Sequence, residues 1–353
     1  MTIPHIQAIG TAVPTHDIHD AFVDWARANL ADPRERKLFA RMVDRSQISH
    51  RWSVLPPGDD GGTLVMPGGF YHGGMPPTSA RMARYAEHAP DLAMEAIAAL
   101  PDFDPESITH LVAVSCTGFV APGIDQILAR RLGLRPDIER VLIGFMGCYG
   151  AVSGLRTARH IIRSEPEARV LVVSVELSTV HLNIETMIEP LLAMLLFGDG
   201  AAAALVGAEP RGFAIEEPFS AALPASGELI TWHIGDDGFR MHLSGEVPGR
   251  IAAALGDDGL RDAVCGGACG EINGWAVHAG GRTILDAVEK ALDLPPEALA
   301  ASRSVLRDQG NMSSATLMFA LERLMRGDPV ERGVALAFGP GLAAEGFRFR
   351  SAA

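Results

Sequence analysis

Short apolar runs alternate with amphipathic stretches from about residue 108 onward. This pattern predicts strands at 111–116, 141–145, 170–177 and 201–206, with helices at 124–132, 148–163 and 189–196. After residue 210 it predicts strands at 213–217, 229–234, 275–278, 334–338 and 347–350, with helices after 248 and at 281–292, 297–306 and 312–325. Continuous apolar strands between helices indicate a parallel or mixed sheet covered on both faces. We therefore predict an α/β protein of two similar halves, residues 1–210 and 211–353.

The first hundred residues show a different pattern. Apolar residues recur at helical spacing over 21–30, 33–43 and 81–100, which predicts a mostly helical region. Between these helices, residues 56–77 contain seven glycines and five prolines. So high a density of turn-forming residues predicts an irregular surface loop that acts as a lid or a docking arm.

The net charge of the chain disfavours some classes of binding partner. With 43 acidic and 30 basic side chains, the 353-residue chain carries a formal net charge of −13. That sign disfavours non-specific binding to nucleic acid or to an anionic membrane surface. Hydrophobic residues make up 48% of the chain, which is too much apolar content for a disordered protein. The composition indicates a soluble globular enzyme.

Cysteine content and the absence of targeting signals suggest a compartment. Four cysteines are too few for a disulfide scaffold in a chain of this length, so we expect reduced thiols. The first 17 residues lack the basic start and apolar core of a signal peptide. The most apolar stretch, 191–208, is interrupted by Asp199 and three glycines and is too short to span a bilayer. We expect a cytoplasmic protein without a membrane span.

Three residues at the ends of predicted elements suggest acyl-transfer chemistry. Cys148 follows the strand at 141–145 through a glycine-containing turn and starts the next helix, where the helix dipole lowers the pKa of a thiol. His278 ends an apolar strand before two glycines, and Asn311 precedes the helix at 312–325. A thiolate can attack a carbonyl while the imidazole and the amide stabilise an oxyanion. A cysteine hydrolase uses the same residue types, so spacing alone leaves that alternative open, as it does a non-catalytic binding module.

Six motifs occur in order between about residues 35 and 350. They are Ser-Cys116-Thr-Gly-Phe-Val-Ala-Pro-Gly, Gly-Phe-Met-Gly-Cys148-Tyr, Leu-Phe197-Gly-Asp-Gly, Trp-Ala-Val-His278-Ala-Gly-Gly, Gly-Asn311-Met-Ser-Ser-Ala and Ala-Phe338-Gly-Pro-Gly. Together they resemble the chalcone synthase-like, or type III, polyketide synthases. The resemblance implies the thiolase fold, with two βαβ-type halves in a five-layer αβαβα architecture, and a homodimer. Single-round ketoacyl synthases share the cysteine, histidine and asparagine but differ around them, and they are the alternative within this fold.

The resemblance also implies a reaction. Cys148 takes an acyl group from a starter coenzyme A (CoA) thioester, and His278 and Asn311 stabilise the enolate that malonyl-CoA forms on losing CO2. The carbanion attacks the acyl-cysteine and lengthens the chain by two carbons, and repeated rounds end in cyclisation to a pyrone, a resorcinol or a related aromatic. The expected partners are malonyl-CoA and an acyl-CoA starter. No metal or organic cofactor is expected.

The substrate cavity follows from the same resemblance. Phe197 matches the aromatic gatekeeper between the CoA tunnel and the cavity, and the loop at 339–341 matches the one that shapes the cyclisation cavity. Met241 stands where the plant enzymes have a second gatekeeper phenylalanine, and its flexible thioether suggests a long aliphatic starter. The expected cavity residues are Phe197, Met241, Cys116, Thr117, His181, Ser313, Gly339, Pro340 and Gly341.

Two arginines and one glycine are the expected contacts of CoA. Arg45 and Arg51 lie in a segment that resembles the family's basic CoA entrance, and Gly280 is expected beside them. Cys265 and Cys269 lie near His278 in sequence but lack a second ligand pair at zinc-finger spacing. We therefore expect no metal site.

Overall fold

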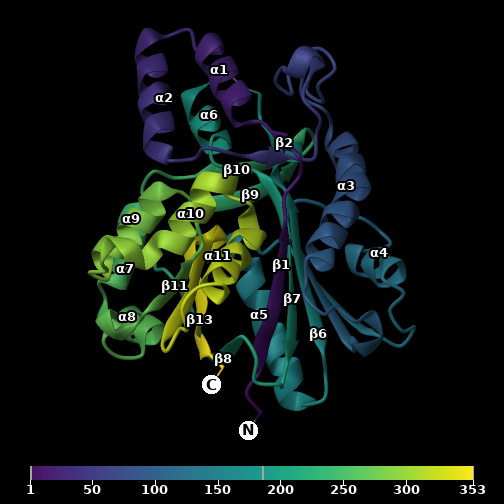
Figure 1. Ribbon diagram of the computed structural model, residues 1–353. Coiled ribbons are helices and arrows are strands. Elements are labelled where there is room, and N and C mark those ends of the chain that lie inside the picture. The colour runs from purple at the N-terminus through teal and green to yellow at the C-terminus, as the bar shows by residue number, and fades with distance from the viewer. Residues whose placement is uncertain (1, 185–186, 353) are drawn as a thin grey trace.

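One mixed sheet runs through the whole molecule (Figure 1). The computed structural model describes residues 2–184 and 187–352, so Met1 and Ala353, the outer ends of the two predicted halves, lie outside it. In this part of the chain nine strands follow the order β11-β12-β13-β8-β1-β7-β6-β4-β5. The parallel pairs are β4 with β5, β4 with β6, and β11 with β12, and the other neighbours are antiparallel.

The strands and α-helices have the following bounds. The strands are β1 (His5–Ala12), β2 (His16–Asp17), β3 (Trp52–Ser53), β4 (His110–Ser115), β5 (Glu139–Gly144), β6 (Val170–Leu177), β7 (Asp199–Gly207), β8 (Phe213–Ala222), β9 (Ile230–Gly235), β10 (Gly238–Leu243), β11 (Gly274–Val277), β12 (Gly333–Gly339) and β13 (Ala343–Ser351). The helices are α1 (His19–Asn29), α2 (Pro33–Ser46), α3 (Thr78–Ala98), α4 (Ile124–Arg131), α5 (Gly150–Ser164), α6 (Ile188–Met194), α7 (Val247–Leu255), α8 (Asp258–Cys265), α9 (Arg282–Ala291), α10 (Ala300–Gln309) and α11 (Thr316–Met325). None of the described helices is long and apolar enough to cross a membrane.

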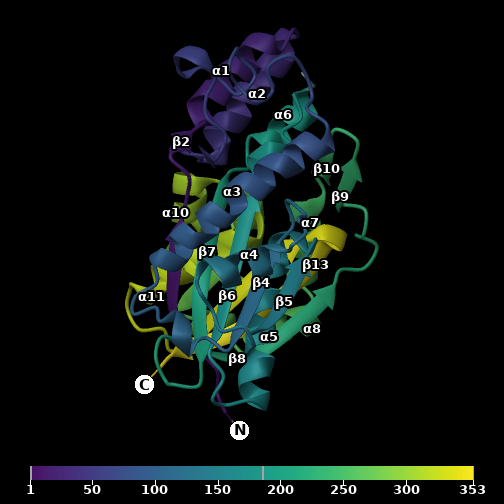
Figure 2. The same ribbon diagram turned by 90° about the vertical axis from the view of Figure 1, so that its right-hand side faces the viewer.

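Three separate apolar cores give the molecule five layers. One core joins α3 and α4 to the outer face of the strands of the first half, as Figure 2 shows from the side. The second lies around α5 and α11 and includes residues from strands of both halves. The third joins α7, α9 and α10 to the strands of the second half. Helices therefore cover both faces of each half-sheet and also fill the space between them, which is the αβαβα arrangement of the thiolase fold.

Strand β1 is the main error of the sequence-based prediction. The first hundred residues were expected to be mostly helical, yet β1 lies in the middle of the sheet between β7 and β8. His5 and Gln7 break its apolar pattern although both are buried. At Gly10 a Cβ atom would lie 2.3 Å from the carbonyl oxygen of Ala96 in α3, so the strand and the helix touch through their backbones. Tertiary packing, rather than the local sequence pattern, determines that these residues form a strand.

A disulfide bond corrects the expectation that the thiols are all reduced. Cys265 ends α8, and Gly266 then takes the left-handed conformation with φ of 59°. The turn brings the Cα atoms of Cys265 and Cys269 to 5.1 Å, and the two sulfur atoms are bonded. The sequence pattern also missed helix α8 itself. Because both sulfurs are in the disulfide, neither is a metal ligand together with His278.

The glycine- and proline-rich loop at 56–77 is irregular, as predicted, and a buried tyrosine attaches it to the rest of the protein. Tyr71 is 1% exposed, and its hydroxyl donates a hydrogen bond of 2.7 Å to the carbonyl of Thr179. The loop packs beside α1 and forms with it a small apolar pocket that Phe22 and Leu64 help to line. The pocket is not lined by Cys148, His278 or Asn311.

A hairpin of β9 and β10 is docked on the turn that follows β4. The aspartates at 236–237 form the hairpin turn between β9 and β10. His181 accepts a hydrogen bond from the amide of Phe239 at Nδ1 and donates one from Nε2 to the carbonyl of Thr117, 2.6 Å away. Trp232 donates from its indole to the carbonyl of Cys116. The imidazole also stacks on Phe239 with ring centroids 4.1 Å apart. These contacts fix the position of the hairpin.

Replacing His181 with glutamine tests this docking through its pH dependence. Burial lowers the pKa of His181 from 6.5 to about 3, so the unfolded state binds more protons between these values. As the pH falls below 6.5 the wild-type protein loses about 1.4 kcal/mol of unfolding free energy per pH unit from this residue, and the variant does not. The variant should be less stable at neutral pH, and urea unfolding should show this deficit shrinking toward pH 4.5. A deficit in unfolding free energy that does not change with pH would contradict the lowered pKa of the buried His181.

Candidate active site

Cys148 lies at the carboxyl end of β5, in a turn that only particular residues allow. Phe145 and Gly147 both have positive φ, 61° and 67°, and a short 3-10 turn over Gly147–Tyr149 then leads into α5. A Cβ atom at Gly147 would lie 2.5 Å from Cδ of Pro340, so a larger residue cannot occupy this position. The turn therefore directs Cys148 toward the second half of the molecule.

His278 follows β11 directly and has no polar partner. Its backbone amide continues the sheet pairing with the carbonyl of Leu336, but within the described residues neither ring nitrogen has a hydrogen-bond partner. The residue is 2% exposed, and burial lowers its pKa to about 3, so the imidazole is neutral. A buried imidazole with two unsatisfied nitrogens is costly, which indicates a group kept ready for a reaction or a ligand.

Asn311 brings the three predicted catalytic residues together. Its side chain lies close enough to Cys148 to lower the pKa of the thiol, and Nδ2 donates to the carbonyl of Gly280, 3.2 Å away. A Cβ atom at Gly280 would lie only 3.5 Å from Nε2 of His278. The backbone of Asn311 is held on both sides by hydrogen bonds with Leu196 and Gly198. The structure thus places thiol, amide and imidazole around one point.

The charge state predicted for Cys148 is wrong. The sequence predicted a thiol at a helix N-terminus with a lowered pKa, but α5 begins two residues later, at Gly150. The residue is 8% exposed, and burial raises the pKa of its thiol to about 12, although hydrogen bonds from Ser313 and Asn311 act in the opposite direction. Desolvation outweighs the helix dipole here. Cys148 is therefore protonated at neutral pH until a base removes its proton.

A second thiol and a buried carboxylate lie next to this point. Sγ of Cys116 is 3.1 Å from Oγ of Ser313, a residue that also contacts Cys148. Glu176, at 0% exposure, accepts hydrogen bonds from the backbone of Cys116 and from the hydroxyls of Thr117 and Ser314. Burial raises the pKa of Glu176. Cys116 and Ser313 thus lie beside Cys148, whereas the hydroxyl of Thr117 is bonded to Glu176.

The expected gatekeeper Phe197 lies beside the catalytic asparagine candidate. It forms an isolated parallel bridge with Asn311 just before β7. Its carbonyl accepts a hydrogen bond of 3.1 Å from Nη1 of Arg51. Met241 lies further out, on β10 opposite Trp232. Phe197 therefore belongs to the immediate surroundings of the site, and Met241 to the docked hairpin.

Arg51 is not a phosphate contact, in contrast to the sequence-based expectation. Its side chain is completely buried and donates to the carbonyls of Met194 and Phe197 and to the imidazole of His19. Burial lowers its pKa to about 9. A guanidinium without access to solvent cannot meet a phosphate at the surface, so Arg51 positions the segment that carries Phe197.

Arg45 and Gly280, the other two expected CoA contacts, lie in different surroundings. Arg45, in the last turn of α2, is exposed, and its carbonyl accepts a hydrogen bond from Arg282. The side chain of Arg282 therefore contacts the backbone of Arg45 at this surface, where it also pairs with Asp286. Gly280 instead lies between His278 and Asn311. The contacts of Arg45 and Gly280 with CoA stay predictions.

The loop of Gly339, Pro340 and Gly341 packs directly against the cysteine turn. A Cβ atom at Gly339 would lie 2.7 Å from the ring of Tyr149 and 3.4 Å from the backbone nitrogen of Cys148. Gly341 has φ of 74°, which glycine adopts most readily. The loop therefore approaches Cys148 closely, at the place where the resemblance expected a wall of the cavity.

Two residues of this region were not singled out from the sequence. Glu176 is the only charged residue in the apolar strand 170–177, and a buried acid in such a strand is a recognisable signal. Arg282 starts α9 after the glycine pair that follows His278, and its position beside Arg45 depends on tertiary packing. Local sequence could therefore have identified the first but not the second.

Comparisons with known proteins agree with this geometry. The family models for the N-terminal and C-terminal domains of chalcone and stilbene synthases match residues 3–210 and 215–353. The alpha-pyrone synthesis polyketide synthase-like Pks18 of Mycobacterium tuberculosis is 31% identical, with 99% of this chain and 91% of that protein covered.

Two solved structures are similar over nearly the whole chain. The C-terminal type III polyketide synthase domain of Steely1, a type I/III hybrid from Dictyostelium, has a TM-score of 0.89 at 26% identity, covering 99% of this chain and 100% of that one. PKS-I from the brown alga Ectocarpus siliculosus has a TM-score of 0.87 at 29% identity, with 99% of both chains covered. The chain therefore belongs to the chalcone and stilbene synthase family and is a type III polyketide synthase with the thiolase fold.

Proposed function

We propose that this polyketide synthase extends an acyl-CoA starter with malonyl-CoA in repeated decarboxylative condensations and then cyclises the product to a pyrone or resorcinol. The observation that carries the proposal is the position of Asn311, whose side chain lies beside the thiol of Cys148 and donates to the carbonyl of Gly280, next to His278. Family membership sets aside the cysteine-hydrolase and binding-module alternatives. No metal or organic cofactor takes part, because loss of the β-carboxylate drives the carbon–carbon bond formation.

The first step loads the starter. Because Cys148 is a buried thiol and His278 a buried neutral imidazole, Sγ can attack the thioester carbonyl as its proton moves to the imidazole. The transfer leaves opposite charges side by side, and these compensate each other in the buried site. The carbon–sulfur bond to CoA then breaks, CoA leaves as its thiol with that proton, and the acyl group stays on Cys148.

The second step forms the new carbon–carbon bond. The neutral imidazole of His278 and the amide of Asn311 each offer an N–H donor to the thioester oxygen of malonyl-CoA. Loss of CO2 leaves an enolate whose negative charge these donors stabilise. The enolate carbon attacks the acyl carbonyl on Cys148, and the cysteine leaves as thiolate and is reprotonated. The chain is then two carbons longer and attached to CoA, ready to return to Cys148.

A homodimer is part of the proposal. Strand β5 is the last strand of the sheet, and within the described residues it pairs only with β4. Val141 and Leu142 on this strand and Phe119 beside it are 39%, 47% and 46% exposed. An unpaired edge strand with exposed apolar side chains is prone to pair with another chain. A second copy placed along β5 would cover this edge.

Starter choice is tested by a screen of acyl-CoA thioesters. We expect fatty acyl-CoA to give pyrone or resorcinol masses, because flexible Met241 stands on the docked hairpin where the plant enzymes have phenylalanine. Product mass from each starter with labelled malonyl-CoA is the measurement. Inert fatty acyl-CoA together with good turnover of a bulky aromatic starter would refute the aliphatic assignment. A single β-ketoacyl product would instead indicate a one-round enzyme.

Replacing Cys148 with alanine should abolish condensation but spare decarboxylation. We expect product formation to fall at least about 1,000-fold, since the acyl-enzyme can no longer form. Release of CO2 from malonyl-CoA should persist in this variant and fall about 100- to 1,000-fold in Asn311→Ala. Cys116→Ser is the matched control, because Cys116 is also buried and bonded to Ser313. Condensation that survives in Cys148→Ala, or is lost only in Cys116→Ser, overturns the assignment.

Replacing Arg45 with glutamate tests the CoA entrance. We expect the KM for malonyl-CoA to rise roughly three- to tenfold, with kcat little changed, because one favourable charge becomes unfavourable at an exposed site. The rise should shrink at high salt. Arg34→Glu, at the other end of α2, makes the same charge change and should leave KM unaltered. Equal effects of the two variants would show that only net charge matters.

A further inference from the structure

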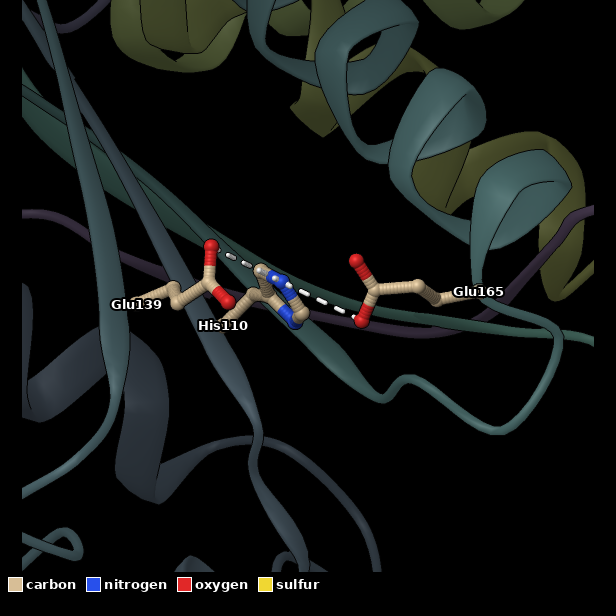
Figure 3. Close-up of side chains that lie close together, drawn as sticks. All are labelled: His110, Glu139 and Glu165. Atoms are coloured by element: carbon tan, nitrogen blue, oxygen red, sulfur yellow. Dashed lines mark ion pairs between the residues drawn. The ribbon is translucent and has the colours of Figure 1, made fainter.

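Three side chains outside the active site converge at the amino ends of β4 and β5 (Figure 3). His110 is the first residue of β4 and Glu139 the first of β5, and the two are register partners in the parallel pair. Glu165 follows the last residue of α5. Cys148 lies beyond the opposite end of β5, so this cluster is separate from the proposed chemistry.

The imidazole of His110 is fixed with one nitrogen facing both carboxylates. Its side chain is only 7% exposed, and Nδ1 is 2.8 Å from Oγ1 of Thr109. That hydroxyl also lies 3.1 Å from the carbonyl of Arg169 and accepts a hydrogen bond from the amide of the same residue. It can accept a hydrogen bond from a protonated Nδ1, the tautomer that a metal bound at Nε2 requires. Nε2 faces Glu139 and Glu165.

The separations fit a shared cation better than direct contact. Nε2 lies 3.7 Å from Oε2 of Glu139 and 4.0 Å from Oε2 of Glu165, beyond normal hydrogen-bond length. The three ligand atoms lie within 4.8 Å of one another. Two ligands of a tetrahedral zinc ion are about 3.4 Å apart, given bonds of about 2.0–2.1 Å. Both glutamate side chains are mostly exposed, so small rotations can close this difference.

From this arrangement we infer that His110, Glu139 and Glu165 form a zinc-binding site. One imidazole nitrogen and two carboxylates suit Zn²⁺, and water can fill a fourth position. Ca²⁺ and Mg²⁺ prefer more oxygen ligands and no imidazole. The backbone is already in place, because the amide of Glu139 donates to Thr109 and that of Glu165 to Ile161. A bound ion would tie edge strand β5 to β4 and to the end of α5.

The contact between Nδ1 of His110 and Oγ1 of Thr109 suits such a ligand. A histidine that binds zinc through Nε2 donates its other N–H to a nearby acceptor, which holds the ring and its tautomer. Oγ1 of Thr109 fills this role. Replacing Thr109 with valine removes the acceptor and should weaken zinc binding about tenfold or more. If this variant loses affinity, zinc is bound by a histidine held in a fixed orientation. Non-specific attraction of a cation to the surface carboxylates would not depend on Thr109.

The test is a zinc titration of the full chain after chelator treatment and buffer exchange. It is made in the Cys148→Ala background, so that the active-site thiol cannot bind the metal. Calorimetry with zinc chloride should show one Zn²⁺ per chain. Binding should be lost in Glu139→Gln and in Glu165→Gln and retained in Glu167→Gln, a nearby exposed glutamate outside the cluster. Cobalt in place of zinc should give the visible absorption of a four-coordinate site.

Condensing activity distinguishes the site from the active centre. In chains with an intact Cys148, the three glutamine variants should keep wild-type activity, because the cluster is at the far end of the strands. Zinc should raise the unfolding temperature of the wild-type chain but not that of Glu139→Gln. No saturable binding, or equal binding in Glu139→Gln and Glu167→Gln, would overturn the proposal. The cluster would then be one imidazole and two carboxylates that hold no metal ion.

Discussion

The two halves of the molecule meet at one side-chain amide. Asn311, from the second half, lies beside the thiol of Cys148, from the first, and donates a hydrogen bond to the loop after His278. This contact requires the turn of Cys148 and the loop of Gly339 to approach within side-chain distance, which the glycines at 147 and 339 permit. The packing of α5 and α11 between the half-sheets sets that approach, since both helices belong to the shared central core. The core thus holds the site together.

Burial determines the chemistry of this site more than local dipoles do. The thiol of Cys148 and the imidazole of His278 are both held in their neutral forms by desolvation. Neutral groups cost less to bury than charged ones, and in the proposed reaction charge forms only as a proton moves between them. The same principle explains Glu176, whose buried carboxylate receives several hydrogen bonds. Among the described residues, His278 has two buried ring nitrogens without a partner, and the proposed chemistry uses them.

The carboxyl ends, the amino ends and the outer edge of β4 and β5 carry different groups of residues. At the carboxyl ends of β4 and β5 lie Cys116 and the turn that carries Cys148. At their amino ends lie His110 and Glu139, which register pairing holds side by side. The outer edge of β5 is unpaired in this chain and exposes apolar side chains. Parallel pairing thus lines up residues at each strand end, and the ends are far enough apart to act independently.

Local sequence determined most of the elements and the positions of the candidate residues within them. Apolar runs and glycine turns act over a few residues, so the strand 170–177 and the strand-end placement of Cys148 and His278 follow from sequence. The strand β1, the burial of Arg51 and the raised pKa of Cys148 depend on residues far away in the chain. So do the cluster around His110 and the neighbours of Asn311. Burial and convergence are non-local, and only the tertiary structure decides them.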